Sequence, residues 1–147
     1  MKRLGFILSL LLVAVGLLSA CGQASSSSAP AQGAPVQTDG GVFFNVTPVQ
    51  LSAMLKSKDF LMVNVHIPYA GEIAGTDLFV PYNEIQANLS KFPADKSAKI
   101  VLYCRSGNMS GIASKEMVKL GFTNIWNVVG GMEAWKMEGK PLLQKQK

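Results

Sequence analysis

The sequence predicts a single α/β domain in which a parallel β-sheet is covered by helices on both faces. Short runs of β-branched and aromatic residues alternate along the chain with segments whose apolar residues recur at helical spacing. Such alternation is typical of parallel sheets joined by helices. The chain has no internal repeat, and about a hundred residues remain once the N-terminal segments are set aside, which suits one core. We therefore expect one sheet with one site.

The sheet is expected from short apolar runs. KIVLYC is the most convincing of them, because it is short and rich in β-branched and aromatic residues. FLMVNV is apolar enough for a strand buried on both faces. The runs are residues 42–45, 60–65, 78–80, 99–104 and 124–129.

The helices are expected from capping residues and apolar spacing. Thr47 and Gln50 have the spacing of a capping box, and Pro48 suits the first helical position. Gly121 is placed to end a later helix. One helix is expected to start at residue 47, and the others occupy residues 83–92, 110–120 and 132–138.

The N-terminal segment, residues 1–20, has the layout of a secretory signal. Lys2 and Arg3 precede an apolar run and then small residues, and the run is short for a membrane span, which needs about 20 residues. Residues 18–21, LSAC, resemble the lipobox of bacterial lipoproteins. The resemblance implies that Cys21 is diacylated and that the protein is exported and lipid-anchored, facing the periplasm or the cell exterior. An uncleaved anchor helix is the alternative.

Residues 21–41 are expected to be the lipidated cysteine and a flexible linker, because they hold almost no large apolar side chain. The folded domain is expected at residues 42–143, with residues 144–147 as a tail. Without Lys2 and Arg3 the chain has 12 basic and 9 acidic residues. The basic residues form no run and no aromatic residues are interleaved with them, so we expect no nucleic-acid partner.

Cys104 is the expected reactive residue. Acylation of Cys21 would leave it as the one free thiol, which suggests use if it is exposed and inertness if it is buried. Cys104 ends a predicted strand, at the edge where parallel α/β sheets bind ligands. Gly107 permits unusual backbone angles, so loop amides and the next helix start can attract negative charge. With Arg105 nearby, this field favours a thiolate and attracts a sulfur-bearing anion.

Two segments carry a family resemblance. CRSGNMS, which starts at Cys104, and NVVGGMEAWKMEGKPL are similar to segments of the single-domain rhodaneses, and the similarity extends over roughly residues 42–142. It implies a rhodanese-like sheet and a sulfurtransferase in which Cys104 forms a persulfide. The sulfur donor would be thiosulfate or a related anion, and the acceptor a thiol, cyanide or a protein.

The resemblance also implies roles for other residues. Gly130, Gly131 and Trp135 would be structural, shaping the turn and filling the wall beside the loop, and no cofactor or metal is implied. The residues implied to bind the donor are Arg105, Ser106, Gly107, Asn108, Met109 and Ser110, the last with its hydroxyl.

Two upstream segments depart from the rhodanese pattern. The family commonly has Asp-Val-Arg where this chain has Asn64, Val65 and His66, and Gly-His-Ile-Pro-Gly-Ala where it reads GEIAGT from Gly71. The usual Asp and Arg charge pair is therefore absent. His66, the one histidine, is a candidate accessory group that either forms a dyad with Cys104 or replaces the missing arginine as a hydrogen-bonding group.

Other functions have less support in the residues. A non-catalytic rhodanese-like module that binds a sulfur anion or a partner protein stays open as the alternative. A phosphatase needs an arginine several residues after the cysteine, but Arg105 is adjacent and Ser110 is the sixth residue on. A zinc site lacks ligands, with one free cysteine and one histidine. Core packing is a better explanation than copper binding for Met109, Met117, Met132 and Met137.

Overall fold

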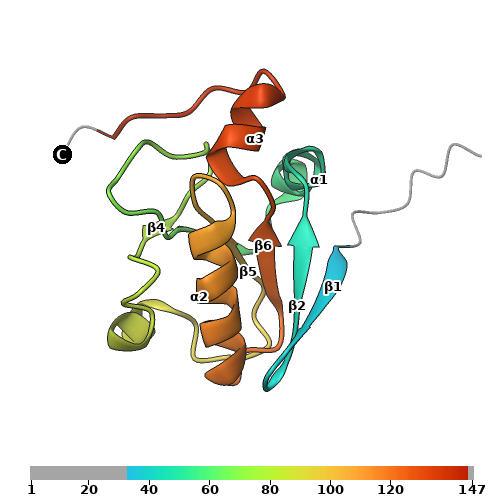
Figure 1. Ribbon diagram of the computed structural model, residues 1–147, viewed down its shortest axis with the longest axis vertical. Coiled ribbons are helices and arrows are strands. Elements are labelled where there is room, and N and C mark those ends of the chain that lie inside the picture. The colour runs from blue at the N-terminus through green and yellow to red at the C-terminus, as the bar shows by residue number, and fades with distance from the viewer. Residues whose placement is uncertain (1–32, 146–147) are drawn as a thin grey trace, which may run out of the picture.

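The computed structural model of the protein describes residues 33–145 (Figure 1). Its strands are β1 (Ala34–Thr38), β2 (Gly41–Val46), β3 (Leu61–Asn64), β4 (Leu78–Phe79), β5 (Ile100–Tyr103) and β6 (Ile125–Val128). Its helices are α1 (Pro48–Met54), α2 (Asn108–Lys119) and α3 (Gly131–Met137), with 3₁₀ helices η1 (Leu55–Ser57) and η2 (Gln86–Lys91). The predicted signal segment and Cys21 lie outside the described residues. Between residues 33 and 145, no helix has the length and apolarity that a membrane span needs.

The six strands form one sheet in the order β1-β2-β6-β5-β3-β4. β1 and β2 are antiparallel, and the other neighbouring pairs are parallel. In the register, Asn64 of β3 lies opposite Tyr103 of β5, and Asn127 of β6 lies opposite Leu102. The carboxyl ends of these parallel strands therefore meet at one edge. The prediction of an α/β fold with a mainly parallel sheet is confirmed.

The linker prediction was wrong for residues 34–41, which form β1, the turn after it and the first residue of β2. Val36 pairs with Phe43 and Thr38 with Gly41. The strand was missed because it is an edge strand, mostly exposed, which is ordered by backbone pairing with β2 rather than by an apolar run of its own. Lys145, in the segment expected to be a tail, forms an ion pair with Glu72 at 2.8 Å.

Helices cover both faces of the sheet, as predicted. On one face α2 packs against Ile100 and Leu102 of β5, together with the segment around η2. On the other face α1 and α3 pack against Val101 and Tyr103, since successive side chains of a strand point to opposite faces. Figure 1 shows α2 lying in front of β5 and β6. The central strand is thus buried on both faces and holds the residue that follows it, Cys104, in a fixed position.

The helix predictions are confirmed in part. The capping box is present, with Gln50 N–H donating to Thr47 Oγ1 at 3.2 Å and Thr47 N–H donating to Gln50 Oε1 at 2.8 Å. The helix expected at residues 83–92 is instead the 3₁₀ helix η2, with a kink at Asn88. Asn88 Nδ2 donates to the carbonyl of Glu84 at 2.8 Å, and side-chain bonds of this kind compete with a regular helix.

Candidate active site

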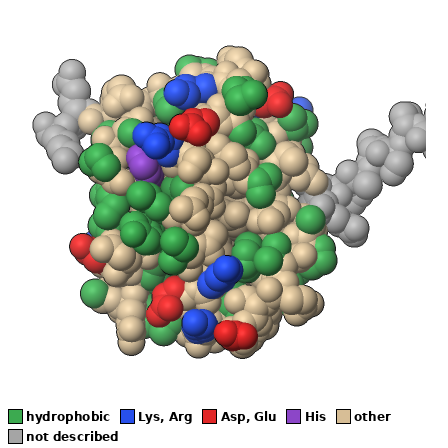
Figure 2. Space-filling model, viewed as in Figure 1, with side chains coloured by type: hydrophobic (Ala, Val, Ile, Leu, Met, Phe, Trp, Pro, Cys, Tyr) green, Lys and Arg blue, Asp and Glu red, His purple; other side chains and the backbone are tan. Residues whose placement is uncertain are grey.

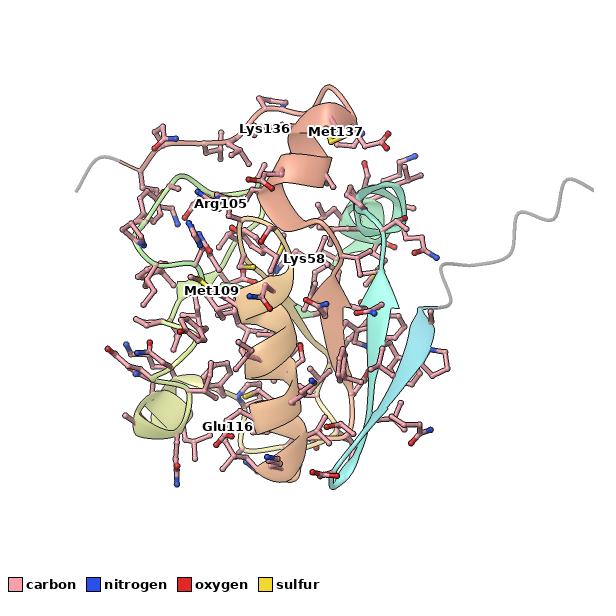
Figure 3. The ribbon with its side chains drawn as sticks, viewed as in Figure 1. Lys58, Arg105, Met109, Glu116, Lys136 and Met137 are labelled. Atoms are coloured by element: carbon pink, nitrogen blue, oxygen red, sulfur yellow. The ribbon has the colours of Figure 1, made fainter. Side chains whose placement is uncertain are left out.

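The predicted site lies at the edge of the sheet where the parallel strands end. β5 ends at Tyr103, Cys104 follows it, and α2 begins at Asn108, so the loop is tight. Figure 3 shows Arg105 above the N-terminal end of α2 and Met109 on that end of the helix. The structure therefore brings the predicted loop residues together where parallel α/β sheets bind ligands.

Two donors face the sulfur of Cys104. The backbone N–H of Gly107 donates to Sγ at 3.1 Å, and the Ser110 hydroxyl lies 3.5 Å from Sγ and 3.2 Å from the carbonyl of Gly107. Gly107 has a φ of +92°, and a Cβ there would lie 3.0 Å from the nitrogen of Gly130. The predicted use of glycine to turn an amide inward is confirmed at this position. A negative charge on Sγ would be stabilised by both donors and by the start of α2.

Cys104 lacks the exposure that a reactive thiol was expected to have, since its exposed fraction is 1%. It belongs to the apolar cluster on the α2 face of the sheet, and Met109 packs against that cluster. Cys104 is therefore almost completely covered from solvent in this conformation. The sequence indicated which residue is the thiol but not its depth, which depends on how separate elements pack.

The loop is held from the other side by α3. The N–H of Met132 donates to the carbonyl of Cys104, and the N–H of Glu133 to the carbonyl of Arg105, both at 2.9 Å. These are the free N–H groups of the start of a helix. A Cβ on Gly131 would overlap the carbonyl oxygen of Cys104 and lie 2.8 Å from that of Arg105. The structural role predicted for Gly131 is confirmed, because only a glycine permits this close approach.

Trp135 is also structural. Its side chain is buried in the cluster between α1, α3 and the sheet, and its Nε1–H donates to the carbonyl of Pro141 at 3.1 Å. A Cβ on Gly130 would lie 2.5 Å from the Cβ of Ala134. Trp135 and Gly130 therefore shape the turn and the helix α3, whose first N–H groups donate to the loop.

Arg105 forms an ion pair with Glu133 of α3. Its Nε lies 3.3 Å from Glu133 Oε1, and both side chains are more than half exposed, at 62% and 51%. An ion pair at this exposure contributes little to stability, so its effect is to position the cation at the rim of the site. The role of Glu133 as the partner of Arg105 was not predicted from the sequence, because only the fold brings α3 beside the loop.

His66 lies just after β3 and is buried, with 6% of its surface exposed. Its backbone N–H donates to Asn64 Oδ1 at 3.0 Å, and its Nδ1 is buried without a hydrogen-bond partner. Burial lowers the pKa of His66 and the charge of Arg105 lowers it further, while Glu133 opposes the shift. Figure 2 shows the purple histidine beside blue and red side chains. The donors to Cys104 Sγ found between residues 33 and 145 are Gly107 and Ser110, so the proposed dyad is not formed in this structure.

Asn64 is the polar residue of an otherwise apolar strand, and its hydrogen bonds account for its place there. It is fully buried, and its Nδ2 donates to the carbonyl of Gly71 at 3.0 Å while its Oδ1 accepts from His66. It therefore fixes the segment between β3 and β4 beside the loop. Tyr103 acts on the same segment, because its hydroxyl accepts from the N–H of Ile73 at 3.1 Å.

We expect His66 to make stability depend on pH. Its pKa lies below 6.5 in the folded protein, so the unfolded chain binds the proton more readily. The contribution of neutral His66 to the free energy of unfolding is complete above pH 6.5, the ordinary pKa of histidine. This contribution is lost as the pH falls through the lower pKa that His66 has in the folded protein. Urea unfolding across this range should show a smaller pH slope in His66→Gln than in the parent. Equal slopes would contradict the burial of a neutral imidazole.

We expect Ser110→Ala to slow the reaction of Cys104 by about tenfold, less than the loss of a full oxyanion donor, because the hydroxyl lies at the long distance of 3.5 Å from Sγ. Ser114→Ala is the matched control, since Ser114 is a buried serine one turn on whose hydroxyl donates to the carbonyl of Ser110. The measurement is the rate of Cys104 alkylation by iodoacetamide. Equal slowing in both variants would indicate a general packing effect instead.

Metal ligands do not gather in the described part of the chain: no three side chains among histidine, cysteine, aspartate and glutamate come together there.

Comparison with known proteins identifies the family. The model of the rhodanese-like domain matches residues 49–138, and the chain therefore belongs to the rhodanese-like domain family. A sulfurtransferase of Allochromatium vinosum is 30% identical over 89 residues, which are 59% of this chain and 81% of that protein. The thiosulfate sulfurtransferase GlpE of Coxiella burnetii is 24% identical over 97 residues, covering 65% of this chain and 89% of that protein.

A third relative is longer than the matched region. An uncharacterised protein of Synechocystis is 29% identical over 101 residues, or 67% of this chain, and the match spans 55% of that relative's length. Among solved structures, a rhodanese-related protein from Thermoplasma volcanium superimposes with a TM-score of 0.59 at 26% identity, covering 69% of this chain and 98% of that one. The family and the two named relatives support a sulfurtransferase-type activity.

Proposed function

We propose that the protein is an exported, lipid-anchored sulfurtransferase that moves a sulfane sulfur from thiosulfate or a related donor to a thiol or cyanide through a persulfide on Cys104. One observation carries the proposal most directly: the Gly107 amide points at Cys104 Sγ at 3.1 Å, in a loop that α3 holds by its backbone. A thiol held under such a donor is suited to nucleophilic attack.

The reaction has two steps that balance. The Cys104 thiolate attacks the outer sulfur of thiosulfate, an S–S bond forms at Sγ, and the S–S bond of thiosulfate breaks so that sulfite leaves with the electron pair. The acceptor then attacks the terminal sulfur of the persulfide. With cyanide this yields thiocyanate and returns the thiolate; with a thiol it yields the acceptor's persulfide. No metal or redox cofactor takes part in either step.

The residues around the sulfur have separate parts in this reaction. The Gly107 amide and the Ser110 hydroxyl would stabilise the negative charge on Sγ before the first step and again when the second step returns it. The rim cation of Arg105, positioned by Glu133, would attract the anionic donor. Because Cys104 is 1% exposed, the loop has to open before the donor enters.

The location rests on the N-terminal sequence. The apolar run that ends in LSAC at Cys21 supports export and acylation of Cys21, which would attach the domain to a membrane through lipid. Fatty-acid labelling of the parent but not of Cys21→Ser is the expected result. Equal labelling of both chains, or of neither, would contradict the anchor.

Release of sulfite in a single turnover tests the reaction. The parent protein, reduced and then freed of reductant, should release about one sulfite per chain when thiosulfate is added without an acceptor, since each chain has one nucleophile for this step. A further addition of cyanide should allow a second release. No sulfite from thiosulfate would remove this donor.

The alternative is a rhodanese-like module that binds a sulfur anion or a partner protein without turnover. The burial of Cys104 favours it, as does the absence of the usual Asp and Arg pair at Asn64 and His66. Absence of sulfite release from thiosulfate and from other sulfane donors, with Cys104 still open to alkylation, would put this alternative ahead.

A further inference from the structure

A cavity of about 180 Å³ lies beside β4 and shares no lining residue with the Cys104 loop. It is lined by Tyr69, Glu72, Phe79 and Lys145. Figure 1 shows the green segment before β4 running beside the red segment that follows α3. At about 30 Å³ for each water molecule, the cavity has room for roughly six waters, or for one small organic ligand.

Glu72 places a buried carboxylate at this cavity. Its side chain is 4% exposed, and its Oε1 lies 2.8 Å from Lys145 Nζ, on a side chain that is 62% exposed. The backbone of Glu72 is fixed as well, because it exchanges two hydrogen bonds with Leu143, at 2.8 and 2.7 Å. A buried carboxylate is costly unless it is paired, so Glu72 requires a cation at this position.

Two aromatic rings also line the cavity. Tyr69 and Phe79 meet edge to face, with ring centroids 5.7 Å apart and an interplanar angle of 78°. The Tyr69 hydroxyl accepts from the backbone N–H of Lys145 at 3.2 Å, and Phe79 is 39% exposed. Aromatic faces beside a carboxylate favour an organic cation, because the rings attract both its charge and its apolar part.

We propose that this cavity binds a primary alkylammonium group, carried by a small amine or by a lysine side chain, with Glu72 as its counter-ion and the rings of Tyr69 and Phe79 against its alkyl chain. Lys145 holds the position on Glu72 until the ligand replaces it. The proposal does not depend on the chemistry of Cys104.

The exchange is feasible because one ammonium group replaces another. Glu72 is never left unpaired, so the cost of baring a buried charge is avoided. The hydrogen bond to Glu72 raises the pKa of Lys145, so the internal competitor stays charged at neutral pH. The Lys145 side chain is mostly exposed and leaves the site without disturbing the core.

Calorimetric titration with n-butylammonium tests the proposal, using the full chain in a nonionic detergent. Binding to Lys145→Ala should be about tenfold tighter than to the parent, because an internal competitor reduces the apparent affinity in proportion to the fraction of sites that it leaves free. Lys115→Ala, which removes an exposed lysine of α2, should bind as the parent does. The uncharged analogue 1-butanol should bind far more weakly than n-butylammonium.

Two further variants in the Lys145→Ala background test the assigned partners. Glu72→Gln should abolish the binding of n-butylammonium, and Phe79→Ala, at a partly exposed position, should weaken it several-fold without loss of folding. A blocked lysine, N-acetyl-lysine N-methylamide, distinguishes the two sources: binding tighter than that of n-butylammonium indicates a protein lysine, and weaker binding a small amine. Equal binding of 1-butanol, or no gain of affinity in Lys145→Ala, would overturn the proposal.

Discussion

Replacing Cys104 by serine should reduce thiosulfate turnover by about 10³-fold or more, because the step that forms the persulfide has no other nucleophile. Cys104 is the thiol found in the described part of the chain, and a hydroxyl in its place neither ionises readily nor forms a stable bond to sulfur. The measurement is the steady-state rate of thiocyanate formation from thiosulfate and cyanide.

Loss of folding has to be separated from loss of the nucleophile. Cys104 belongs to an apolar cluster, so a serine there places a hydroxyl in apolar surroundings at some cost. Cys104→Ala avoids that cost and should be equally inactive while unfolding at a urea concentration close to that of the parent. Substantial turnover by a folded alanine variant would refute the role of Cys104.

Gly131→Ala should lower the free energy of unfolding by about 3 kcal/mol, from overpacking against a fixed backbone together with the positive φ of this residue. The added Cβ would overlap the carbonyl oxygen of Cys104 and crowd that of Arg105. The start of α3 would have to withdraw from the loop, and the bonds from Met132 and Glu133 would weaken with it. Urea unfolding gives the stability, and the sulfite assay gives the effect on the site.

Gly121→Ala is the matched control for this substitution. Gly121 also has a positive φ, +87°, but no atom lies within 4 Å of the position of its Cβ. Gly121→Ala should lower the free energy of unfolding by about 1 kcal/mol, the cost of the left-handed conformation alone, and should leave sulfite release unchanged. If both variants lost the same stability, the close approach of Gly131 to the loop would not matter.

The sequence predicted those parts of the fold that depend on local pattern. The runs at 60–65 and 99–104 became β3 and β5 because uninterrupted apolar runs suit strands that are covered on both sides. β1 was not predicted, because an edge strand is ordered by backbone hydrogen bonds to its neighbour more than by apolar residues of its own. The kink at Asn88 was missed because it depends on one side-chain bond to Glu84.

The site was predictable in its residues but not in its surroundings. The position of Cys104 after a strand follows from the order of residues along the chain. So does the presence of a glycine at position 107, where the loop has a positive φ. The hydrogen bonds from Met132 and Glu133 to the loop join segments far apart in sequence, so no local sequence pattern predicts them. The burial of Cys104 and the neutral His66 are likewise results of packing.

The mass of the peptide that contains Cys104, measured before and after treatment with thiosulfate, tests the central claim most directly. The protein beginning at Gly33 retains β1 and its pairing with β2 and is the suitable sample, with Cys104→Ala beside it. We expect one added sulfur atom on Cys104 of the parent, removed by cyanide and absent from the variant. An unchanged mass after thiosulfate and after other sulfane donors, with Cys104 still free to be alkylated, would contradict the account.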